Sequence, residues 1–345
     1  MTQFNDNFLR ACRMEPVDHI PVWFMRQAGR YQPEYREIRK KYSLIEICKH
    51  PDVCTEVTLK PIEQLNVDAA ILFSDITLPL GPMGIPFDIV ENVGPVIHEP
   101  IKTADDINRV KLFDANETLP YVGETIRQLN AALNVPLIGF VGAPFTLASY
   151  MIEGGPSKAF YKTKIFMYSQ PKAWHALMDK LAVSMADYLR FQKENGCQAL
   201  QVFDSWVGNL SIEDYREYVY PHMQKMFSML KDLNVPLIHF GVVTGHLLEM
   251  MKDCGATVVG LDWRVNVSEA WKLLKHEVAI QGNLDPAAII APWHIIEEKS
   301  KFILDQIDRP GFIFNLGHGI MPQADVATMR RIVDYVHQFP VSSNK

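Results

Sequence analysis

Short runs of apolar residues recur along the chain, and most of them end in a turn or in polar side chains. The eight clearest runs span residues 20–25, 69–73, 136–142, 199–203, 236–241, 258–261, 278–282 and 312–316. A strand with one solvent-exposed face alternates apolar and polar residues. A run that stays apolar therefore indicates a strand buried on both faces, as in a parallel sheet. The pattern therefore predicts eight buried parallel strands.

Between these runs, apolar residues repeat with the period of an α-helix. The longest stripe extends from Trp174 to Leu189 and is followed by Gly196, and shorter stripes occupy residues 122–133, 247–254 and 329–336. Such a stripe gives a helix one apolar face to bury, and a glycine just beyond the stripe commonly ends the helix. We therefore expect helices between the strands.

Strands that alternate with helices predict an α/β fold. The simplest arrangement is a single (β/α)8 TIM barrel over residues 1–345, and a doubly wound sheet is the alternative. Two apolar stretches, residues 87–90 and 95–98, flank the turn-forming residues 91–94, which predicts an inserted hairpin after the second strand. No linker interrupts the pattern, and a disordered tail is expected only from about residue 341.

Composition restricts the class of protein. The 345 residues are 48% hydrophobic and 21% charged, with a net charge of −6, so the clustered positive face of a nucleic-acid-binding protein is not expected. The five cysteines form no C-x-x-C pair, which fits reduced thiols. No apolar run reaches the about eighteen residues of a membrane span, and the first residues lack the features of a signal peptide. These observations predict a cytoplasmic protein without a membrane partner.

Chemically active side chains follow most of the predicted strands, at the end of a parallel barrel where active sites are built. Arg26 and Arg30 follow the first run, and Asp75 follows the second. A guanidinium presents paired donors that match a carboxylate and does not lose its proton, so the arginine pair indicates a site for a polycarboxylate or a phosphate. A solvated basic turn is the alternative. The other polar residues near strand ends are Ser74, Thr146, Tyr150, Asp204, Ser205, Asp262, Arg264, Asn283 and His318.

Some of these polar residues have simpler structural explanations. Asp204, Asp262 and Asn283 are expected to cap helices or to bond loop amides. His239, inside an apolar run, is expected to be a core histidine whose hydrogen bonds are satisfied.

Several segments resemble signatures of the uroporphyrinogen decarboxylase family, in order along nearly the whole chain. They are Arg26-Gln-Ala-Gly-Arg-Tyr31, Phe73-Ser-Asp-Ile76, Gly142-Ala-Pro-Phe-Thr-Leu147, Tyr150-Met-Ile-Glu-Gly-Gly155, Phe203-Asp-Ser205, Val259-Gly-Leu-Asp-Trp263, Gln281-Gly-Asn-Leu-Asp-Pro286 and Asn315-Leu-Gly-His-Gly319. The resemblance implies a single barrel that forms a homodimer. It also implies a carboxy-lyase of heme biosynthesis that converts the four acetate side chains of uroporphyrinogen III to methyl groups, giving coproporphyrinogen III and CO2 without a cofactor or metal.

The resemblance further implies roles for individual residues. The Asp75 carboxylate would accept hydrogen bonds from the pyrrole N–H groups of the substrate and stabilise the cation formed when a ring carbon is protonated. Arg26 and Arg30 would hold substrate carboxylates and take part in catalysis. Arginine is a poor general acid, so the proton donor stays open between an arginine, a water and a substrate carboxyl group. Further substrate contacts are expected at Tyr150, Ser205, His318, Phe73, Phe203 and Arg39.

Three of these assignments have plain alternatives. Arg39 has Lys40 and Lys41 beside it, so it is equally a charge on a helix surface. For Phe73 and Phe203, ordinary core packing is the alternative.

Two other functions compete with the decarboxylase. The related zinc-dependent methyltransferases need thiolate ligands, and their His-x-Cys is replaced here by His239-Phe-Gly241, with no cysteine after Cys254. A protein that only sequesters a tetrapyrrole or another polyanion is the second. An aspartate among arginines would weaken such a receptor, whereas it would help a catalyst that forms a cation.

Overall fold

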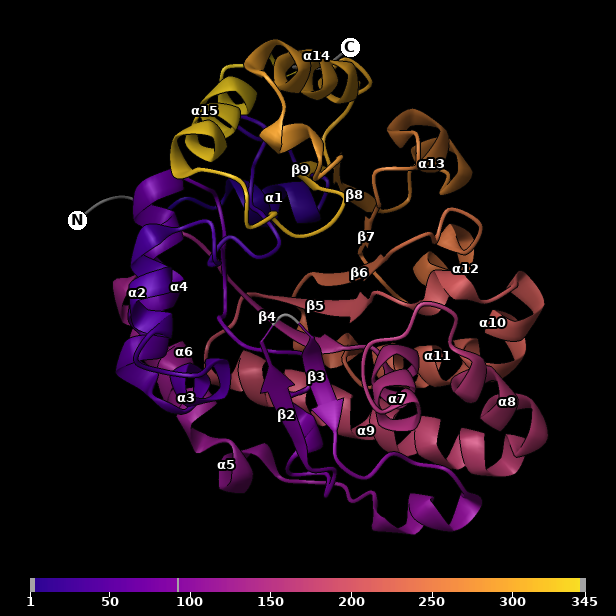
Figure 1. The fold of residues 1–345 in the computed structure, drawn as a ribbon. Coiled ribbons are helices and arrows are strands. Elements are labelled where there is room, and N and C mark those ends of the chain that lie inside the picture. Colours follow the sequence, from indigo (N-terminus) through magenta and orange to yellow (C-terminus); the bar gives the residue numbers. More distant parts are fainter. Residues whose placement is uncertain (1–3, 92, 342–345) are drawn as a thin grey trace.

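The computed structural model describes residues 4–91 and 93–341. Its centre is a curled sheet whose seven strands are all parallel, in the order β1-β4-β5-β6-β7-β8-β9, with helices packed around it (Figure 1). The strands are β1 (Ala70–Ile71), β4 (Leu137–Gly142), β5 (Ala199–Asp204), β6 (Leu237–Gly241), β7 (Val258–Gly260), β8 (Ala279–Leu284) and β9 (Phe312–Leu316). They confirm seven of the eight predicted strands.

Helices connect and cover these strands. The α-helices are α1 (Asn7–Cys12), α2 (Pro33–Arg39), α3 (Leu44–Lys49), α4 (Pro51–Leu65), α5 (Ala115–Thr118), α6 (Pro120–Ala132), α7 (Pro144–Glu153), α8 (Tyr161–Ser169), α9 (Pro171–Asn195), α10 (Ile212–Tyr218), α11 (Tyr220–Ser228), α12 (Leu248–Asp253), α13 (Val267–Leu273), α14 (Trp293–Leu304) and α15 (Val326–His337). Short 3-10 helices are η1 (Leu78–Leu80), η2 (Ala104–Arg109), η3 (Val207–Asn209), η4 (Lys231–Leu233) and η5 (Ala288–Ile290). The four predicted helical stripes lie in α6, α9, α12 and α15.

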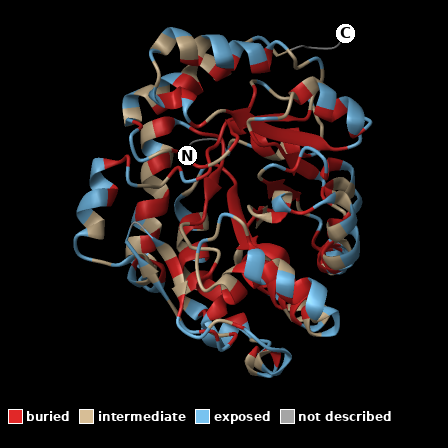
Figure 2. Ribbon diagram, turned by 45° about the vertical axis from the view of Figure 1, so that its right-hand side comes forward, coloured by how far each residue is buried: buried red, intermediate tan, exposed pale blue. Residues whose placement is uncertain are grey.

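The strands are buried on both faces, as their apolar runs predicted. Every residue of β4, β6 and β8 is buried, and Figure 2 shows the strands as the buried centre of the molecule. Alternate residues serve two different cores: Ile138 and Phe140 join a cluster enclosed by the sheet, whereas Leu137 and Val141 join the cluster between sheet and helices. Phe8 of α1 also belongs to the enclosed cluster, so this helix covers one end of the sheet.

The first predicted strand, residues 20–25, is not a regular strand. Only Val22 forms a bridge, parallel to Phe314 of β9, and its carbonyl accepts a hydrogen bond from the Asp68 amide at 2.7 Å. Pro21 has no N–H to give to a ladder, and the Val22 amide donates instead to the Asp68 side chain at 2.7 Å. The segment therefore runs between β9 and the start of β1, but side chains replace part of its ladder.

A second, two-stranded sheet lies apart from the parallel one. In it, β2 (Phe87–Val90) pairs antiparallel with β3 (Gly94–Ile97), and Phe87 lies opposite Ile97. Of the predicted disordered tail, residues 342–345 lie outside the described residues.

No helix in the described ranges combines the length and the apolar content that crossing a bilayer requires.

Candidate active site

The loop that carries Arg26 and Arg30 is held by buried side chains. Gln27 accepts a hydrogen bond from the Phe24 amide at 3.1 Å and donates to the carbonyl of Ala69 at 3.1 Å, which ties the loop to the beginning of β1. Arg26 has a left-handed backbone with φ of 61°, an uncommon conformation for a residue with a side chain and one that clusters at functional sites. Both arginines are exposed. The fold thus presents two cations on an anchored loop.

Asp75 follows β1 and is half-buried. Its Oδ1 accepts two hydrogen bonds from Thr77, one from the backbone N–H at 2.8 Å and one from the hydroxyl at 2.5 Å. Within the part of the chain that the structure describes, no hydrogen bond to Oδ2 is recorded. One carboxylate oxygen is therefore fixed, and the other is available to a ligand.

Tyr150 of α7 lies within electrostatic range of both Asp75 and Arg26. Burial, together with the negative charge of Asp75, raises the pKa of the Tyr150 phenol, and the positive charge of Arg26 opposes this shift. The hydroxyl therefore stays protonated at neutral pH and can donate a hydrogen bond. Its ring packs on that of Trp206, with centroids 4.0 Å apart and an angle of 36° between the planes. Trp206 was not among the predicted site residues.

His318 lies in the loop after β9, between the two glycines of its motif. A Cβ at Gly319 would come within 2.7 Å of Arg26 Cγ, and a Cβ at Gly317 within 2.9 Å of the backbone carbon of Asp262. A side chain at position 317 would therefore collide with backbone, and one at position 319 would displace the Arg26 side chain. His318 Nδ1 accepts a hydrogen bond from the Gly319 amide at 2.7 Å, so the proton of the neutral ring is assigned to Nε2.

The charge state of His318 follows from its surroundings. Burial first, and then the positive charges of Arg26 and Arg264, lower its pKa to about 4, although Asp262 acts in the opposite direction. The imidazole is therefore neutral at pH 7 and acts as a hydrogen-bond donor through Nε2.

Arg30, Arg39 and Asp75 are brought together around one buried phenol, Tyr35. Burial raises the pKa of Tyr35, the charges of Arg39 and Arg30 lower it, and that of Asp75 raises it. Arg39 also donates to the Tyr42 carbonyl at 3.2 Å, so part of its guanidinium is engaged by the turn that follows α2.

The two predicted phenylalanines occupy different surroundings. Phe203 of β5 contacts Phe140 edge-on at 5.3 Å and Phe240 at 6.0 Å, and Phe240 in turn lies 6.5 Å from His318. Phe73 packs against Tyr35 at 5.6 Å. Both residues are half-buried, so each keeps part of its surface exposed.

Ser205, the last predicted contact, directly follows β5 and is half-buried. Since β5 pairs with β4, this places Ser205 at the same end of the sheet as Tyr150.

The structural explanations predicted for four buried polar residues hold only in part. Asp262 does accept hydrogen bonds from the amides of Val243 and Arg264. Asn283 instead donates to two carbonyls, those of Asp262 and Val265, each at 2.7 Å.

Asp204 and His239 depart further from expectation. Asp204 Oδ1 accepts from the hydroxyl of Thr146 in α7 at 2.9 Å, so this oxygen bonds a side chain and not a helix end or a loop amide. Its Oδ2 lies 3.7 Å from His239 Nε2, and neither atom has a hydrogen-bond partner among the residues that the structure describes. His239 is therefore a core residue, as predicted, but its hydrogen bonds are not fully satisfied.

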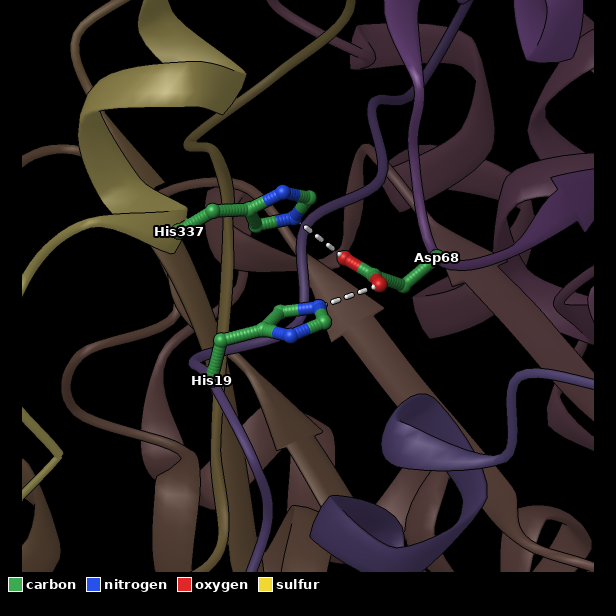
Figure 3. A group of neighbouring side chains, drawn as sticks. All are labelled: His19, Asp68 and His337. Atoms are coloured by element: carbon green, nitrogen blue, oxygen red, sulfur yellow. Dashed lines mark hydrogen bonds and ion pairs between the residues drawn. The ribbon is translucent and has the colours of Figure 1, made fainter.

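One group of metal-ligand type lies at the opposite end of the sheet, and Figure 3 shows its three side chains converging. His19 Nε2 donates to Asp68 Oδ1 at 2.7 Å, and His337 Nε2 donates to Oδ2 at 2.8 Å. Asp68 also accepts from the Asn5 side chain at 2.8 Å and from the Val22 amide at 2.7 Å. The side-chain atoms that could bind a metal thus hydrogen-bond to one another. Through these bonds, the N-terminal segment and α15 are attached to Asp68, just before β1.

The five cysteines are all free and buried. Burial raises the pKa of every one of these thiols, whereas a zinc ligand must be a thiolate. Position 241 beside His239 is a glycine. These residues therefore do not provide the thiolate ligands that a zinc-dependent methyltransferase needs.

Comparisons with known proteins agree over nearly the whole chain. A family model described as "Uroporphyrinogen decarboxylase (URO-D)" matches residues 3–339. The chain is 53% identical over 341 residues to the uroporphyrinogen decarboxylase of Geobacillus kaustophilus, covering 98% of each chain. It is 52% identical over 341 residues to that of Halalkalibacterium halodurans, covering 99% of each. Among solved structures, a methyltransferase from Methanosarcina mazei superposes with a TM-score of 0.81 at 17% identity, over 97% of this chain and 98% of that one. At this identity, the last similarity concerns the fold alone.

Proposed function

The chain belongs to the uroporphyrinogen decarboxylase family, and on that premise we propose that it decarboxylates the four acetate side chains of uroporphyrinogen III. The products are coproporphyrinogen III and CO2, and the reaction belongs to heme biosynthesis. In this chain, the proposal rests on the hydrogen bonding of Asp75. Thr77 binds one of its carboxylate oxygens, and the other oxygen can accept hydrogen bonds from a ligand.

We assign Asp75 to the centre of the macrocycle. Four pyrrole N–H groups of a reduced, flexible macrocycle can point to a single acceptor, and an ionised carboxylate accepts hydrogen bonds without donating any. Since Oδ1 is occupied by Thr77, Oδ2 is the oxygen that would receive them. A fixed anion here also stabilises positive charge on the ring, and it needs no reorganisation when that charge appears.

The substrate carboxylates would be held by the neighbouring donors. Arg26 and Arg30 provide positive charge, Tyr150 a protonated hydroxyl, and His318 a neutral Nε2–H. A neutral imidazole donates one directed hydrogen bond, whereas guanidiniums pair with both oxygens of a carboxylate. Arg26, beside Tyr150 and packed against the His318 loop, would hold the carboxylate nearest to both.

Ser205, Phe203, Phe73 and Arg39 complete the proposed substrate contacts. Phe203 is half-buried and belongs to the aromatic row that leads to His318, which suits the apolar face of a macrocycle. Arg39, beside Arg30 and Asp75 at Tyr35, would extend the cationic side.

The chemistry needs an electron sink, because the loss of CO2 from an alkyl acetate leaves an electron pair on carbon. Protonation of a ring carbon makes the pyrrole cationic, the C–COO⁻ bond breaks, and its electron pair forms an exocyclic double bond to the ring. A second proton then adds to the exocyclic carbon, and the ring carbon returns its proton. Each cycle is R–CH2–COO⁻ + H⁺ → R–CH3 + CO2, with no external oxidant, cofactor or metal.

The first proton would come from Arg26 or Arg30, or through a water or a substrate carboxyl group beside them. An arginine gives up a proton poorly, which favours the indirect routes. His318 is a poor source at neutral pH because its pKa is about 4.

The finer points of architecture and setting are also proposals. The segment around Val22, bonded on one side to β9 and on the other to Asp68, supports an eighth barrel position that closes one (β/α)8 domain over residues 1–345, with β2 and β3 as an insertion. The family resemblance supports a homodimer and a cytoplasmic location. Sedimentation of the purified chain tests the dimer.

Anaerobic incubation with uroporphyrinogen III, followed by oxidation and chromatography, tests the function. The proposal predicts porphyrins with seven to four carboxyl groups. If the macrocycle binds but only the eight-carboxyl species is recovered, the protein sequesters the tetrapyrrole instead.

A further inference from the structure

Arg264 lies in the loop after β7, at the same end of the sheet as the proposed site. Its Nη1 donates to Asp262 Oδ2 at 3.0 Å, and its guanidinium stacks on the Trp263 ring at 3.8 Å. The Arg264 side chain is 48% exposed, whereas Asp262 is fully buried. Among residues 4–91 and 93–341, the Arg264 guanidinium uses one of its five N–H groups. The guanidinium is therefore oriented, and its other N–H groups can bind a ligand.

Asp262 does not depend on this guanidinium alone. The Val243 amide donates to its Oδ2, and the backbone amide of Arg264 donates to its Oδ1 at 2.9 Å. A buried carboxylate with two amide donors already has partners. The positive charge of Arg264 is therefore not needed to satisfy the buried Asp262 carboxylate.

The loop of His318 connects Arg264 to Arg26. Gly317 packs against the backbone of Asp262 and Trp263, and Gly319 packs against the side chain of Arg26. His318 thus lies between the two arginines, and the positive charge of each lowers its pKa. Along the sheet, the order is β7 with Arg264, β8, β9 with His318, the Val22 segment with Arg26, and β1 with Asp75.

We propose that Arg264 binds a side-chain carboxylate of the substrate, in one row of donors with His318 and Arg26. The inference rests on the proposed function and extends it to a residue outside the contacts assigned above. A substrate with eight carboxylates offers more anions than Arg26 and Arg30 can pair, and a stacked arginine keeps its fork oriented for a carboxylate. Because Arg264 is the member of the row farthest from Asp75, it contributes to binding and not to the chemical step.

Steady-state kinetics of Arg264→Gln test the proposal. We expect KM for uroporphyrinogen to rise about tenfold, the usual effect of losing a hydrogen bond to a charged group, with kcat within about twofold because the interaction is equal in the ground and transition states. Arg264→Lys keeps the charge but not the fork, so an intermediate KM is expected. Arg331→Gln is the matched control, since Arg331 stacks on Trp293 at 3.7 Å in the same way but lies on α15, outside the sheet.

The number of carboxylates in the substrate identifies the group that Arg264 holds. If the penalty also appears in the inhibition constant of coproporphyrinogen III, whose four carboxylates are all propionates, the partner is a propionate. If it disappears, the partner is an acetate that is lost during the reaction.

A second set of measurements distinguishes loss of the Arg264 contact from misfolding of the variant. Removal of the Arg264 charge should raise the pKa of His318, followed by NMR of the histidine ring, while circular dichroism and the melting temperature stay close to those of the parent. An unchanged KM in a folded Arg264→Gln variant, or an equal rise in Arg331→Gln, overturns the inference. If the parent protein itself yields no product, the proposed function fails instead.

Discussion

Thr77 donates both its backbone N–H and its hydroxyl to the same oxygen of Asp75, at 2.8 and 2.5 Å. Two donors on Oδ1 fix the rotation of the carboxyl group, and Oδ2 has no donor among the residues that the structure describes. The Asp75 carboxylate is therefore oriented before any substrate binds, as the proposed stabilisation of a transient cation requires.

Thr77→Val tests this orientation. Valine keeps the shape and the backbone donor but removes the hydroxyl, so the carboxylate loses one charged hydrogen bond, and kcat should fall about tenfold with a smaller change in KM. Thr118→Val, which removes an exposed hydroxyl bonded to the Asp114 carbonyl, should leave both constants unchanged. An unaltered kcat in Thr77→Val would show that this hydroxyl does not position Asp75.

Arg30→Lys should reduce binding and turnover together. Lysine keeps the charge but cannot pair with two carboxylate oxygens at once, so KM should rise and kcat should fall, with about a tenfold loss in kcat/KM. Arg127→Lys, an exposed arginine of α6 paired with Glu124, is the control. If Arg30→Lys has the same kcat/KM as the parent, Arg30 makes no such paired contact.

The neutral state of His318 predicts a dependence of stability on pH. Its folded pKa of about 4 lies below the ordinary value of 6.5, so between these values the unfolded chain binds a proton that the folded chain does not. The free energy of unfolding should therefore fall as pH drops from about 6.5 towards 4. His318→Gln should remove this part of the decline in urea titrations, and an identical decline in the variant would contradict the assignment.

The Asp68 group predicts a linkage of the same sign in a lower range of pH. Burial alone would raise the pKa of Asp68, but the hydrogen bonds and charges of His19 and His337 outweigh it and lower the pKa. The stabilisation is therefore present above the unfolded value near 3.8 and is lost as pH falls below it.

Asp68→Asn should lower the free energy of unfolding by about 3 kcal/mol at pH 7, a difference that narrows below pH 4. Asp179→Asn is the matched control, because Asp179 also bonds a histidine, His222, at 2.9 Å but is 51% exposed, and such surface pairs contribute about 1 kcal/mol or less. Equal losses in the two variants would contradict the role given to burial.

The repeating apolar runs were sufficient to predict the parallel sheet, because a strand covered on both faces leaves a local signal. They failed for residues 20–25, where the Val22 amide bonds to Asp68, a side chain far away in the sequence. No local pattern reports a bond of that kind.

The motifs supplied the candidate site residues but not how they are arranged. The Nε2–H form of His318 depends on a bond from Gly319, and the neighbourhood of Tyr150 depends on Trp206, which follows a different strand. The contribution of Arg264 appears only when the loops after β7 and β9 are seen packed together.

The most direct test of the account is the anaerobic turnover of Asp75→Asn beside the parent protein. Asparagine keeps the size of the side chain but removes the charge that stabilises the protonated pyrrole, so kcat should fall by about two to three powers of ten while KM changes about threefold at most. A folded Asp75→Asn protein whose kcat stays near that of the parent would contradict the claim that this carboxylate stabilises the cation.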